Sequence, residues 1–412
     1  MPIIQSLLDL DFYKLTMGQL VFKKFPKVQV KYAFKNRTDS VKLAQIIPLE
    51  LLSMELEHAR TLRLNNSELH YLRGTNEYQD RMFSEEYLQF LKDLQLPPYR
   101  LGTDGVTGQI NLLIEGDWAT TIYWETIALA IINELYFLTQ IQSMSDFERD
   151  VLFAQGKIRL AEKIHLLKAK PEINFAEFGT RRRFSRQWQD YVVKVLAAEL
   201  PKSKFIGTSN TLLAMKHGLL PIGTSAHELP MIYSGIFHDN DNAIRQSHNQ
   251  VLTDWWQEYD WGLSVALTDT FGTQFFFQDM TKEQAEKWKG LRQDSGDPFE
   301  FGEATIKFYE GHGIDPREKL IIFSDGLDVL TILKLADRFQ NRIKVSFGWG
   351  TNLTNDLGLK PLSLVIKAVE ANGHGTVKLS DNLAKAMGHP DDVARFKKVF
   401  GYTNTFEKKC TY

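Results

Sequence analysis

The sequence predicts an α/β protein, an irregular α/β barrel of strand–turn–helix units with an additional α+β domain formed largely by the N-terminal third. Two observations predict this fold. From about Asn174 onward, short β-prone runs repeatedly end in a cluster of small and polar residues, and a helical pattern follows most of them. Before that point, strand-like and helix-like stretches are mixed without such a repeat. We expect the first domain to span residues 1–135 and the barrel residues 136–374, with residues 375–412 a candidate addition to the first domain.

The N-terminal third contains one clear strand and several helices. In residues 28–35 large apolar side chains occupy every second position, a period that predicts a strand with one face in water. Residues 106–116 are a second strand candidate, and residues 42–96, rich in Leu, Glu and Arg, predict helices that end before Pro97. The apolar stretch 126–137 includes polar residues and is too short to span a bilayer, so it predicts a buried helix.

Seven polar clusters follow the predicted strands of the barrel. Turn preference alone explains any one cluster, because Gly, Ser, Thr and Asp favour turns. Seven in phase, several with a charged residue or a histidine, favour a functional face, since the C-terminal ends of barrel strands carry the active site. Helical patterns at 184–196 and 327–339 fit the intervening helices. The clusters are residues 178–181, 207–210, 223–227, 268–270, 293–297, 324–326 and 348–352.

Composition and charge exclude several classes of protein. Hydrophobic residues make up 43% and charged residues 24% of the 412 residues, as in ordinary globular proteins. A net charge of -2 gives no reason to expect a nucleic-acid or membrane partner. The single cysteine, Cys410, cannot build a disulfide framework, and the N-terminus lacks the basic region of a signal peptide. We therefore expect a cytoplasmic protein.

Two clusters are suited to phosphate. Gly348 and Gly350, followed by Thr351, allow backbone N–H groups to close on an anion, although the segment matches neither a Walker A loop nor a full GxGxxG motif. Arg181, Arg182 and Arg183 stand at the start of a predicted helix, where three adjacent arginines could neutralise a polyphosphate. A solvated helix start is the alternative, but cations are unfavourable at a helix N-terminus, which favours a bound anion.

The remaining chemistry lies in acidic residues and one histidine. Asp294, Asp325 and Asp269 offer carboxylates for ribose hydroxyls or for water around Mg²⁺, although acidic turn residues also cap helices. His227 follows a predicted strand and is a candidate metal ligand, base, nucleophile or hydrogen-bonded core residue. Glu228 and Asp269 are the candidates to orient its ring.

Eight segments form an ordered set that resembles one family. They are DLDFYK at 9–14, EFGTRR at 177–182, GTSN at 207–210, GTSAHE at 223–228, DSGDP at 294–298, SDGLD at 324–328, FGWGTN at 347–352 and VKLS at 377–380. As a set they resemble nicotinate phosphoribosyltransferases from end to end, with nicotinamide phosphoribosyltransferase as a more distant relative.

The resemblance implies an irregular, TIM-like barrel of the type II phosphoribosyltransferases and a specific reaction. Nicotinate and 5-phosphoribosyl 1-pyrophosphate would give nicotinate mononucleotide and pyrophosphate, the first step of NAD salvage from nicotinate. ATP would be a co-substrate and Mg²⁺ a cofactor. The resemblance also implies a homodimer with shared active sites.

By the same resemblance, the pyridine ring would lie between Phe178 and a Tyr13 supplied by the other subunit, with Arg292 facing the nicotinate carboxylate. Ser209 lies where the nicotinamide enzyme has an aspartate. Losing that negative charge suits an anionic substrate, which is our main reason for choosing the acid over the amide.

The resemblance assigns the sugar donor to a second group of residues. Arg181, Arg182 and Lys378 would contact phosphates, Asp294 would hold the ribose hydroxyls, and a cradle would hold the 5-phosphate. His227 matches the histidine that ATP phosphorylates in this family, with Glu228 and Asp269 orienting it. The cradle and its neighbour are Asp325, Gly326, Gly348, Gly350 and Thr351.

Three alternatives remain open from the sequence. The first is the same chemistry on nicotinamide or quinolinate. The second is a barrel aldolase or isomerase acting on a sugar phosphate, which would need a lysine or carboxylate base at a strand end. The third is a non-catalytic nucleotide sensor, in which the whole motif set would be idle.

Overall fold

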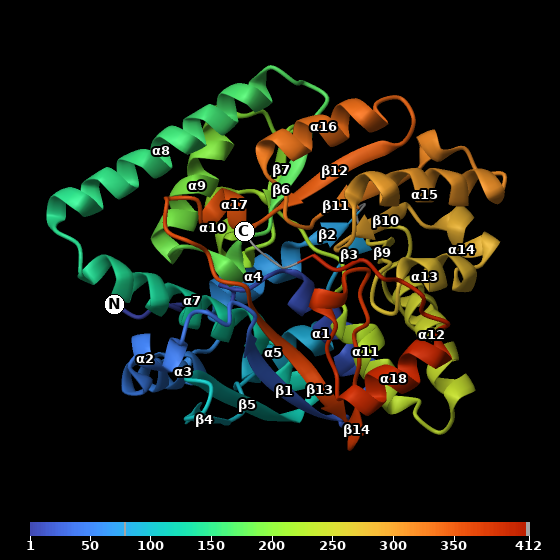
Figure 1. The fold of residues 1–412 in the computed structure, drawn as a ribbon, viewed down its shortest axis with the longest axis horizontal. Coiled ribbons are helices and arrows are strands. Elements are labelled where there is room, and N and C mark those ends of the chain that lie inside the picture. The colour runs from blue at the N-terminus through green and yellow to red at the C-terminus, as the bar shows by residue number, and fades with distance from the viewer. Residues whose placement is uncertain (78–79, 409–412) are drawn as a thin grey trace.

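The computed structural model describes residues 1–77 and 80–408, and Cys410 lies outside this range. Two sheets dominate it, a parallel sheet surrounded by helices and an antiparallel sheet at the opposite end of the molecule (Figure 1). One continuous hydrophobic core contains side chains from both sheets, including Tyr32 and Phe347. The two parts of the chain are therefore packed together.

The parallel sheet has seven strands in the order β8-β7-β6-β12-β11-β10-β9. Each strand comes immediately before one of the seven polar clusters, so the predicted strand–turn–helix repeat is confirmed. The sheet curls into a half-barrel, and the edge strands β8 and β9 are not paired with each other. The strands are β6 (Phe175–Glu177), β7 (Phe205–Thr208), β8 (Leu220–Pro221), β9 (Val265–Leu267), β10 (Gly290–Gln293), β11 (Leu320–Phe323) and β12 (Lys344–Trp349).

Helices follow these strands, and cluster residues start several of them. Asn210 caps α10, Asp297 caps α15 and Asp328 caps α16, each accepting a hydrogen bond from a backbone N–H of the first turn. The helices predicted at 184–196 and 327–339 are confirmed as α9 and α16. This part contains α8 (Asp146–Lys168), η1 (Thr180–Arg182), α9 (Arg186–Glu199), α10 (Thr211–His217), α11 (Glu228–Ile236), α12 (Asp241–Tyr259), α13 (Thr273–Asp279), α14 (Lys282–Lys287), α15 (Pro298–Gly311), η2 (Pro316–Glu318), α16 (Val329–Phe339) and α17 (Thr351–Thr354).

The antiparallel sheet combines strands from both ends of the chain in the order β14-β13-β1-β5-β4. Because β13 pairs with β1 along its whole length, the chain has already returned to this sheet by Leu364. The predicted domain boundary at residue 374 is therefore wrong, because the chain rejoins the sheet of the first domain before residue 375. The strands are β1 (Gln29–Asn36), β4 (Tyr99–Asp104), β5 (Gln109–Asp117), β13 (Leu364–Ala371) and β14 (His374–Gly375).

The strand expected at 106–116 is also only partly correct. Val106 lies in the turn between β4 and β5 and is 97% exposed. Asp104 stabilises this turn because its side chain accepts hydrogen bonds from the N–H groups of Val106 and Thr107. The strand begins at Gln109 instead.

The remaining helices belong mainly to the N-terminal part. Residues 126–137 are all buried in α7, as predicted. Within the described ranges, no helix has the length and apolar character needed to cross a membrane. The elements are α1 (Tyr13–Lys24), α2 (Leu43–Ile46), α3 (Leu49–Thr61), α4 (Asn66–Gly74), β2 (Asn76–Glu77), β3 (Asp80–Arg81), α5 (Glu85–Asp93), α6 (Trp118–Thr121), α7 (Trp124–Gln142), η3 (Leu383–Lys385) and α18 (Pro390–Val399).

A buried ion pair fastens the N-terminal segment to the barrel. The guanidinium of Arg183 donates to both carboxylate oxygens of Asp9, at 2.6 and 2.9 Å, and both residues are almost fully buried. Asn210, at the end of β7, donates to the same carboxylate at 2.7 Å. Arg183 is therefore an internal anchor and not part of an anion site with Arg181 and Arg182.

We predict that Arg183→Met lowers the free energy of unfolding by about 3–5 kcal/mol, because it leaves the Asp9 carboxylate buried without its charge partner. Urea unfolding followed by tryptophan fluorescence measures the effect. The control is Arg149→Met, which removes an exposed ion pair with Asp146 and should change stability by less than about 0.5 kcal/mol. Adding Asp9→Leu to Arg183→Met should recover part of the loss; no recovery would contradict the role assigned to the pair.

Candidate active site

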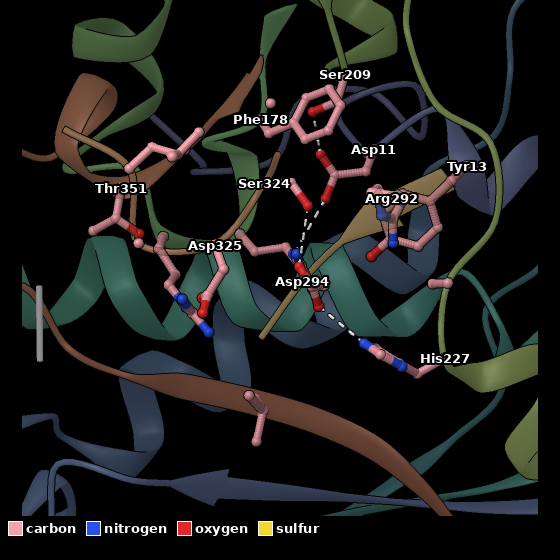
Figure 2. Close-up of a pocket in the computed structure, with 18 of the residues that line it drawn as sticks. Asp11, Tyr13, Phe178, Ser209, His227, Arg292, Asp294, Ser324, Asp325 and Thr351 are labelled. Atoms are coloured by element: carbon pink, nitrogen blue, oxygen red, sulfur yellow. Dashed lines mark hydrogen bonds and ion pairs between the residues drawn. The ribbon is translucent and has the colours of Figure 1, made fainter. Parts of the chain in front are cut away.

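A pocket opens at the C-terminal ends of the parallel strands and is closed from the other side by the N-terminal segment and β13 (Figure 2). Most of the residues predicted from the sequence line it, and only Glu228 and Asp269 do not. The predicted residues that line it are Tyr13, Phe178, Arg181, Arg182, Ser209, His227, Arg292, Asp294, Asp325, Gly326, Gly348, Gly350, Thr351 and Lys378.

The pocket concentrates positive charge in a chain that is almost neutral overall. Seven lysine and arginine side chains line it against three aspartates, whereas the whole chain has a formal net charge of -2. A concave site of one sign attracts ligands of the opposite sign. The cations are Arg37, Arg181, Arg182, Arg292, Lys367, Lys378 and Lys385.

Two aromatic rings, Phe178 and Tyr13, reach the pocket, and glycines make room for both. A Cβ atom at Gly348 would lie 2.3 Å from the Phe178 ring, so β12 needs glycine there. A Cβ atom at Gly223 would lie 2.8 Å from the backbone nitrogen of Tyr13, so the loop after β8 needs glycine to approach α1.

Tyr13 lines the pocket of its own chain. The expectation that a second subunit supplies this ring is therefore wrong. The physical reason is that the N-terminal segment pairs with the end of β7, through an antiparallel bridge between Asp11 and Asn210, and so carries Tyr13 into the site.

Arg292 on β10 has the character of a carboxylate-binding residue. Its Nη1 donates to the Ser225 carbonyl at 3.0 Å, and its buried Nε has no hydrogen-bond partner among the described residues. Burial lowers the pKa of this guanidinium, although arginine remains charged. A buried cation with an unused donor favours an anionic ligand atom beside it.

Ser209 lies beside a carboxylate that sequence reasoning does not place there. Its Oγ donates to Asp11 Oδ1 at 2.6 Å, and Figure 2 shows this contact at the edge of the pocket. Asp11 Oδ2 is buried, 3.5 Å from Arg181 Nε, and burial raises the pKa of the carboxyl. Although Ser209 itself has no negative charge, Asp11 brings a carboxyl to the same part of the pocket. The local charge therefore depends on Asp11 together with the cations Arg181 and Arg292.

His227, on the loop after β8, spans the open edge of the half-barrel. Its Nδ1 lies 2.9 Å from Thr270 Oγ1, beyond β9, and its Nε2 lies 2.9 Å from Asp294 Oδ2. Lys378 Nζ donates to the same Nε2 at 2.8 Å. Burial, and next the charge of Lys378, lower the pKa of His227 to about 4. The ring is therefore neutral at physiological pH, and Nε2 is the nitrogen that faces the charged groups of the pocket.

The prediction that Glu228 orients this ring is wrong. Its carboxylate is turned into the core, where it accepts hydrogen bonds from Lys14, Tyr32 and Trp118 at 2.5, 2.5 and 2.8 Å. The position after His227 begins α11, and a helical turn directs the two side chains to different sides.

Asp269 acts on the histidine through its charge. It lies 3.6 Å from His227 Nε2, beyond hydrogen-bond distance, and 3.5 Å from Lys378 Nζ, while Ser295 donates to it at 2.5 Å. Its Oδ1 is buried without a hydrogen-bond partner within the described ranges.

Asp269, Asp294 and His227 offer ligand atoms within 4.8 Å of one another. Mg²⁺ prefers oxygen ligands, so the two carboxylates fit this ion and the imidazole does not. The unpartnered Asp269 Oδ1 supports the fit. Burial alone would raise the pKa of Asp294, but the hydrogen bond to His227 and the charges of Lys378 and Lys385 hold it well below its ordinary value.

A glycine-bearing rim forms the far side of the pocket. It includes Gly326 after β11 and the segment from Gly348 to Thr351 at the end of β12. Asp325 is paired with Lys385 at 2.5 Å, and Arg182 also reaches the pocket from η1. Backbone N–H groups and cations from several segments thus meet here, as a phosphate site requires.

Sequence reasoning misses Asp11, Arg37, Lys367 and Lys385 as pocket residues. Only Lys367 leaves a usable signal, because it interrupts an otherwise apolar strand, LVIKAV at 364–369. A buried lysine in such a run indicates a charge partner or a ligand. Arg37, Lys385 and Asp11 resemble ordinary surface or turn residues until the tertiary structure places them.

A barrel with a cationic pocket at its strand ends, holding two aromatic rings and a neutral histidine, defines the class of α/β-barrel proteins that bind flat, phosphorylated anions. Residues 173–404 match the nicotinate phosphoribosyltransferase (NAPRTase) family, and residues 8–133 match the NAPRTase N-terminal domain. The chain therefore belongs to the nicotinate phosphoribosyltransferase family.

Solved structures of the family agree over the whole chain. The nicotinate phosphoribosyltransferase of Porphyromonas gingivalis is 32% identical, with a TM-score of 0.86 over 97% of this chain and 100% of that one. The nicotinate phosphoribosyltransferase of Vibrio cholerae is 35% identical, with a TM-score of 0.86 over 98% of this chain and 94% of that one.

We predict that His227 titrates with a pKa near 4, well below the ordinary value of 6.5. NMR spectra of histidine-labelled protein across the pH range measure this, and His227→Gln identifies its signal. Lys378→Met should raise the midpoint, because it removes a positive charge that disfavours protonation. A midpoint near 6.5 in the unsubstituted protein would mean that the ring is not held as described.

Proposed function

We propose that this chain joins nicotinate to 5-phosphoribosyl 1-pyrophosphate, with ATP consumed through a phosphorylated His227, as the first step of NAD salvage from nicotinate. The observation that carries the proposal is Arg292, which lines the pocket together with Tyr13 and Phe178 and whose buried Nε has no hydrogen-bond partner among the described residues. A flat ring with one carboxylate suits this combination.

The transfer needs few proton movements. The pyridine nitrogen of nicotinate has a free lone pair, which forms the new bond to C1 of the ribose. The bond from C1 to the pyrophosphate oxygen breaks, and the electron pair leaves with pyrophosphate. Cations positioned at that oxygen stabilise the departing charge, and Arg181, Arg182, Lys378 and the additional Arg37, Lys367 and Lys385 supply them.

The sugar donor divides between the acidic and the glycine-bearing parts of the pocket. Asp294 and Asp325 would hold ribose hydroxyls, and Gly326, Gly348, Gly350 and Thr351 would hold the 5-phosphate; all six line the pocket. Mg²⁺ held by Asp269 and Asp294 would supply positive charge to the pyrophosphate.

His227 is placed to accept a phosphoryl group on Nε2. The bond from Nε2 to the γ-phosphorus of ATP forms, the bond from that phosphorus to the bridging oxygen breaks, and ADP leaves. Nε2 accepts a hydrogen bond from Lys378 in the neutral ring, so its lone pair needs no deprotonation before the attack, while Nδ1 keeps its proton beside Thr270 Oγ1, 2.9 Å away. Lys378, 2.8 Å from Nε2, would pair with the new phosphate.

The position of Tyr13 changes what we expect of the assembly. Since Tyr13 lines the pocket of its own chain, the proposed reaction does not need this ring from a second subunit. The homodimer and the cytoplasmic location stay predictions.

Nicotinamide is the second candidate substrate, and one observation favours testing it. Asp11 Oδ2 is an unused acceptor beside Ser209, and a carboxamide can donate to it where a carboxylate cannot. The positive charge of Arg181 and Arg292 favours the acid.

We predict ATP-stimulated formation of nicotinate mononucleotide from nicotinate, the ribosyl donor and Mg²⁺, and little product from nicotinamide in parallel. His227→Ala should abolish the ATP-dependent part and leave some basal transfer, because the pyridine nitrogen needs no base. Product is followed by chromatography. Incubation with γ-labelled ATP should put acid-labile phosphate on the unsubstituted protein alone. Equal use of both pyridines would overturn the choice of the acid, and absence of label would overturn the phosphohistidine.

We predict that Arg292→Ala weakens nicotinate binding by about 2–5 kcal/mol, because the bound carboxylate would lose a buried partner. Steady-state kinetics measure the nicotinate KM, and calorimetry measures its Kd. Arg317→Ala is the control, since Arg317 is exposed and paired only with Asp315 in the described structure. An unchanged KM would remove Arg292 from the carboxylate site.

A further inference from the structure

Glu125 lies behind the pocket at the first turn of α7, where it is 1% exposed. It does not line the pocket, and nothing in its sequence context distinguishes it from other helix-start acids. The reaction proposed above does not use it. It is nevertheless in contact with four polar groups from three other segments of the chain.

The two carboxylate oxygens of Glu125 divide these contacts. Oε2 lies 2.6 Å from Lys14 Nζ and accepts a hydrogen bond from Tyr13 OH at 3.4 Å. Oε1 accepts from Lys367 Nζ at 3.1 Å and lies 3.5 Å from Arg181 Nη1. Its partners thus come from α1, β13 and η1.

Three of these partners line the pocket, namely Tyr13, Arg181 and Lys367. Tyr13 belongs to the aromatic slot, and its ring also lies under the Arg181 guanidinium, 5.8 Å from ring centre to Cζ. Lys367 belongs to the cationic part. A single carboxylate therefore contacts residues of both the aromatic slot and the cationic part of the pocket.

The charges around Lys367 make this carboxylate important. Burial lowers the pKa of Lys367, and the charges of Arg181 and Lys14 lower it further, while Glu125 raises it. Lys378 also repels it. Among the described residues, Glu125 is the only carboxylate in an ion pair with Lys367, whereas Lys14 has Glu228 as a second partner.

We propose that Glu125 is a positioning residue for both substrates: its carboxylate holds the Tyr13 ring at the slot and keeps Lys367 and Arg181 together as cations facing the pocket. The inference rests on the proposed function. It adds a residue that touches neither substrate and acts on the binding of each through a different neighbour.

Glu125→Gln keeps the shape of the side chain and removes its charge. It should raise the KM for nicotinate through Tyr13 and the KM for the ribosyl donor through Lys367, each roughly tenfold, with a smaller effect on kcat. The donor KM should also begin to rise at a lower pH than in the unsubstituted protein, because Lys367 loses its proton earlier among Arg181, Lys14 and Lys378. Calorimetry with inorganic pyrophosphate measures the same loss without turnover.

Glu134→Gln is the matched control. Glu134 lies on the same helix, is 7% exposed, and accepts from the Arg186 backbone N–H at 2.8 Å, with Arg183 Nε 3.5 Å away. It does not line the pocket. This variant should lower the thermal unfolding midpoint and leave both KM values and the pH profile unchanged.

Two further variants decide whether Glu125 acts as described. Lys367→Met should raise the donor KM, and adding Glu125→Gln to it should raise that KM little further; additive effects would contradict action through Lys367. Glu125→Asp keeps the charge and should restore the pH profile. If Glu125→Gln does not fold, Glu125→Asp replaces it as the test and should cause a smaller rise in both KM values. Unchanged KM values in a folded variant would overturn the inference. An unsubstituted protein that binds pyrophosphate but does not convert nicotinate contradicts the proposed function instead.

Discussion

Mutual repulsion of cations gathered in one pocket is the constraint on which the site depends. Seven lysines and arginines converge on one pocket, and they stay folded there because carboxylates placed behind or beside them offset their charge. Glu125 pairs with Lys14 and Lys367, Asp325 with Lys385, and Asp269 and Asp294 face Lys378. Inside the pocket, three aspartates do not cancel the positive charge of the seven lysines and arginines. An anionic ligand would neutralise the remaining positive charge. The same arrangement holds the neutral His227 between Asp294 and Lys378.

The fold meets this constraint by closing an open barrel with a second domain. The parallel sheet leaves β8 and β9 unpaired with each other, and His227, on the loop after β8, reaches Thr270 beyond β9 across that gap. The backbone N–H of Leu379 also donates to the Thr270 carbonyl, so the segment that carries Lys378 seals the same edge. β13 brings Lys367 from the antiparallel sheet, and the N-terminal segment brings Asp11 and Tyr13. The cations and carboxylates of the pocket thus come from several separate parts of the chain.

The same geometry explains why Tyr13 lines the pocket of its own chain. The Asp9–Arg183 pair and the bridge from Asp11 to Asn210 fix the N-terminal segment beside the end of β7, two residues before α1 begins at Tyr13. Tyr13 has no freedom to serve another site unless this segment detaches, which would separate Arg183 from Asp9, its hydrogen-bonded charge partner. The choice between nicotinate and nicotinamide depends in turn on Asp11, because its carboxyl stands beside Ser209.

The sequence by itself determined the strand–turn–helix repeat and the side of the sheet on which the chemistry lies. Cluster residues such as Phe178, Asp294 and Gly350 directly follow strands, and parallel strands place their ends at one face whatever the rest of the chain does. Only the tertiary structure decided which domain supplies Lys367, Arg37 and Asp11, and that Glu228 turns away from the histidine while Glu125 stands behind the pocket. These positions depend on contacts between segments far apart in the chain, as in the pairing of β1 with β13. Local periodicity and motif spacing contain no information about such contacts, because the free energy that fixes them comes from packing and charge pairing across the interface between the two domains.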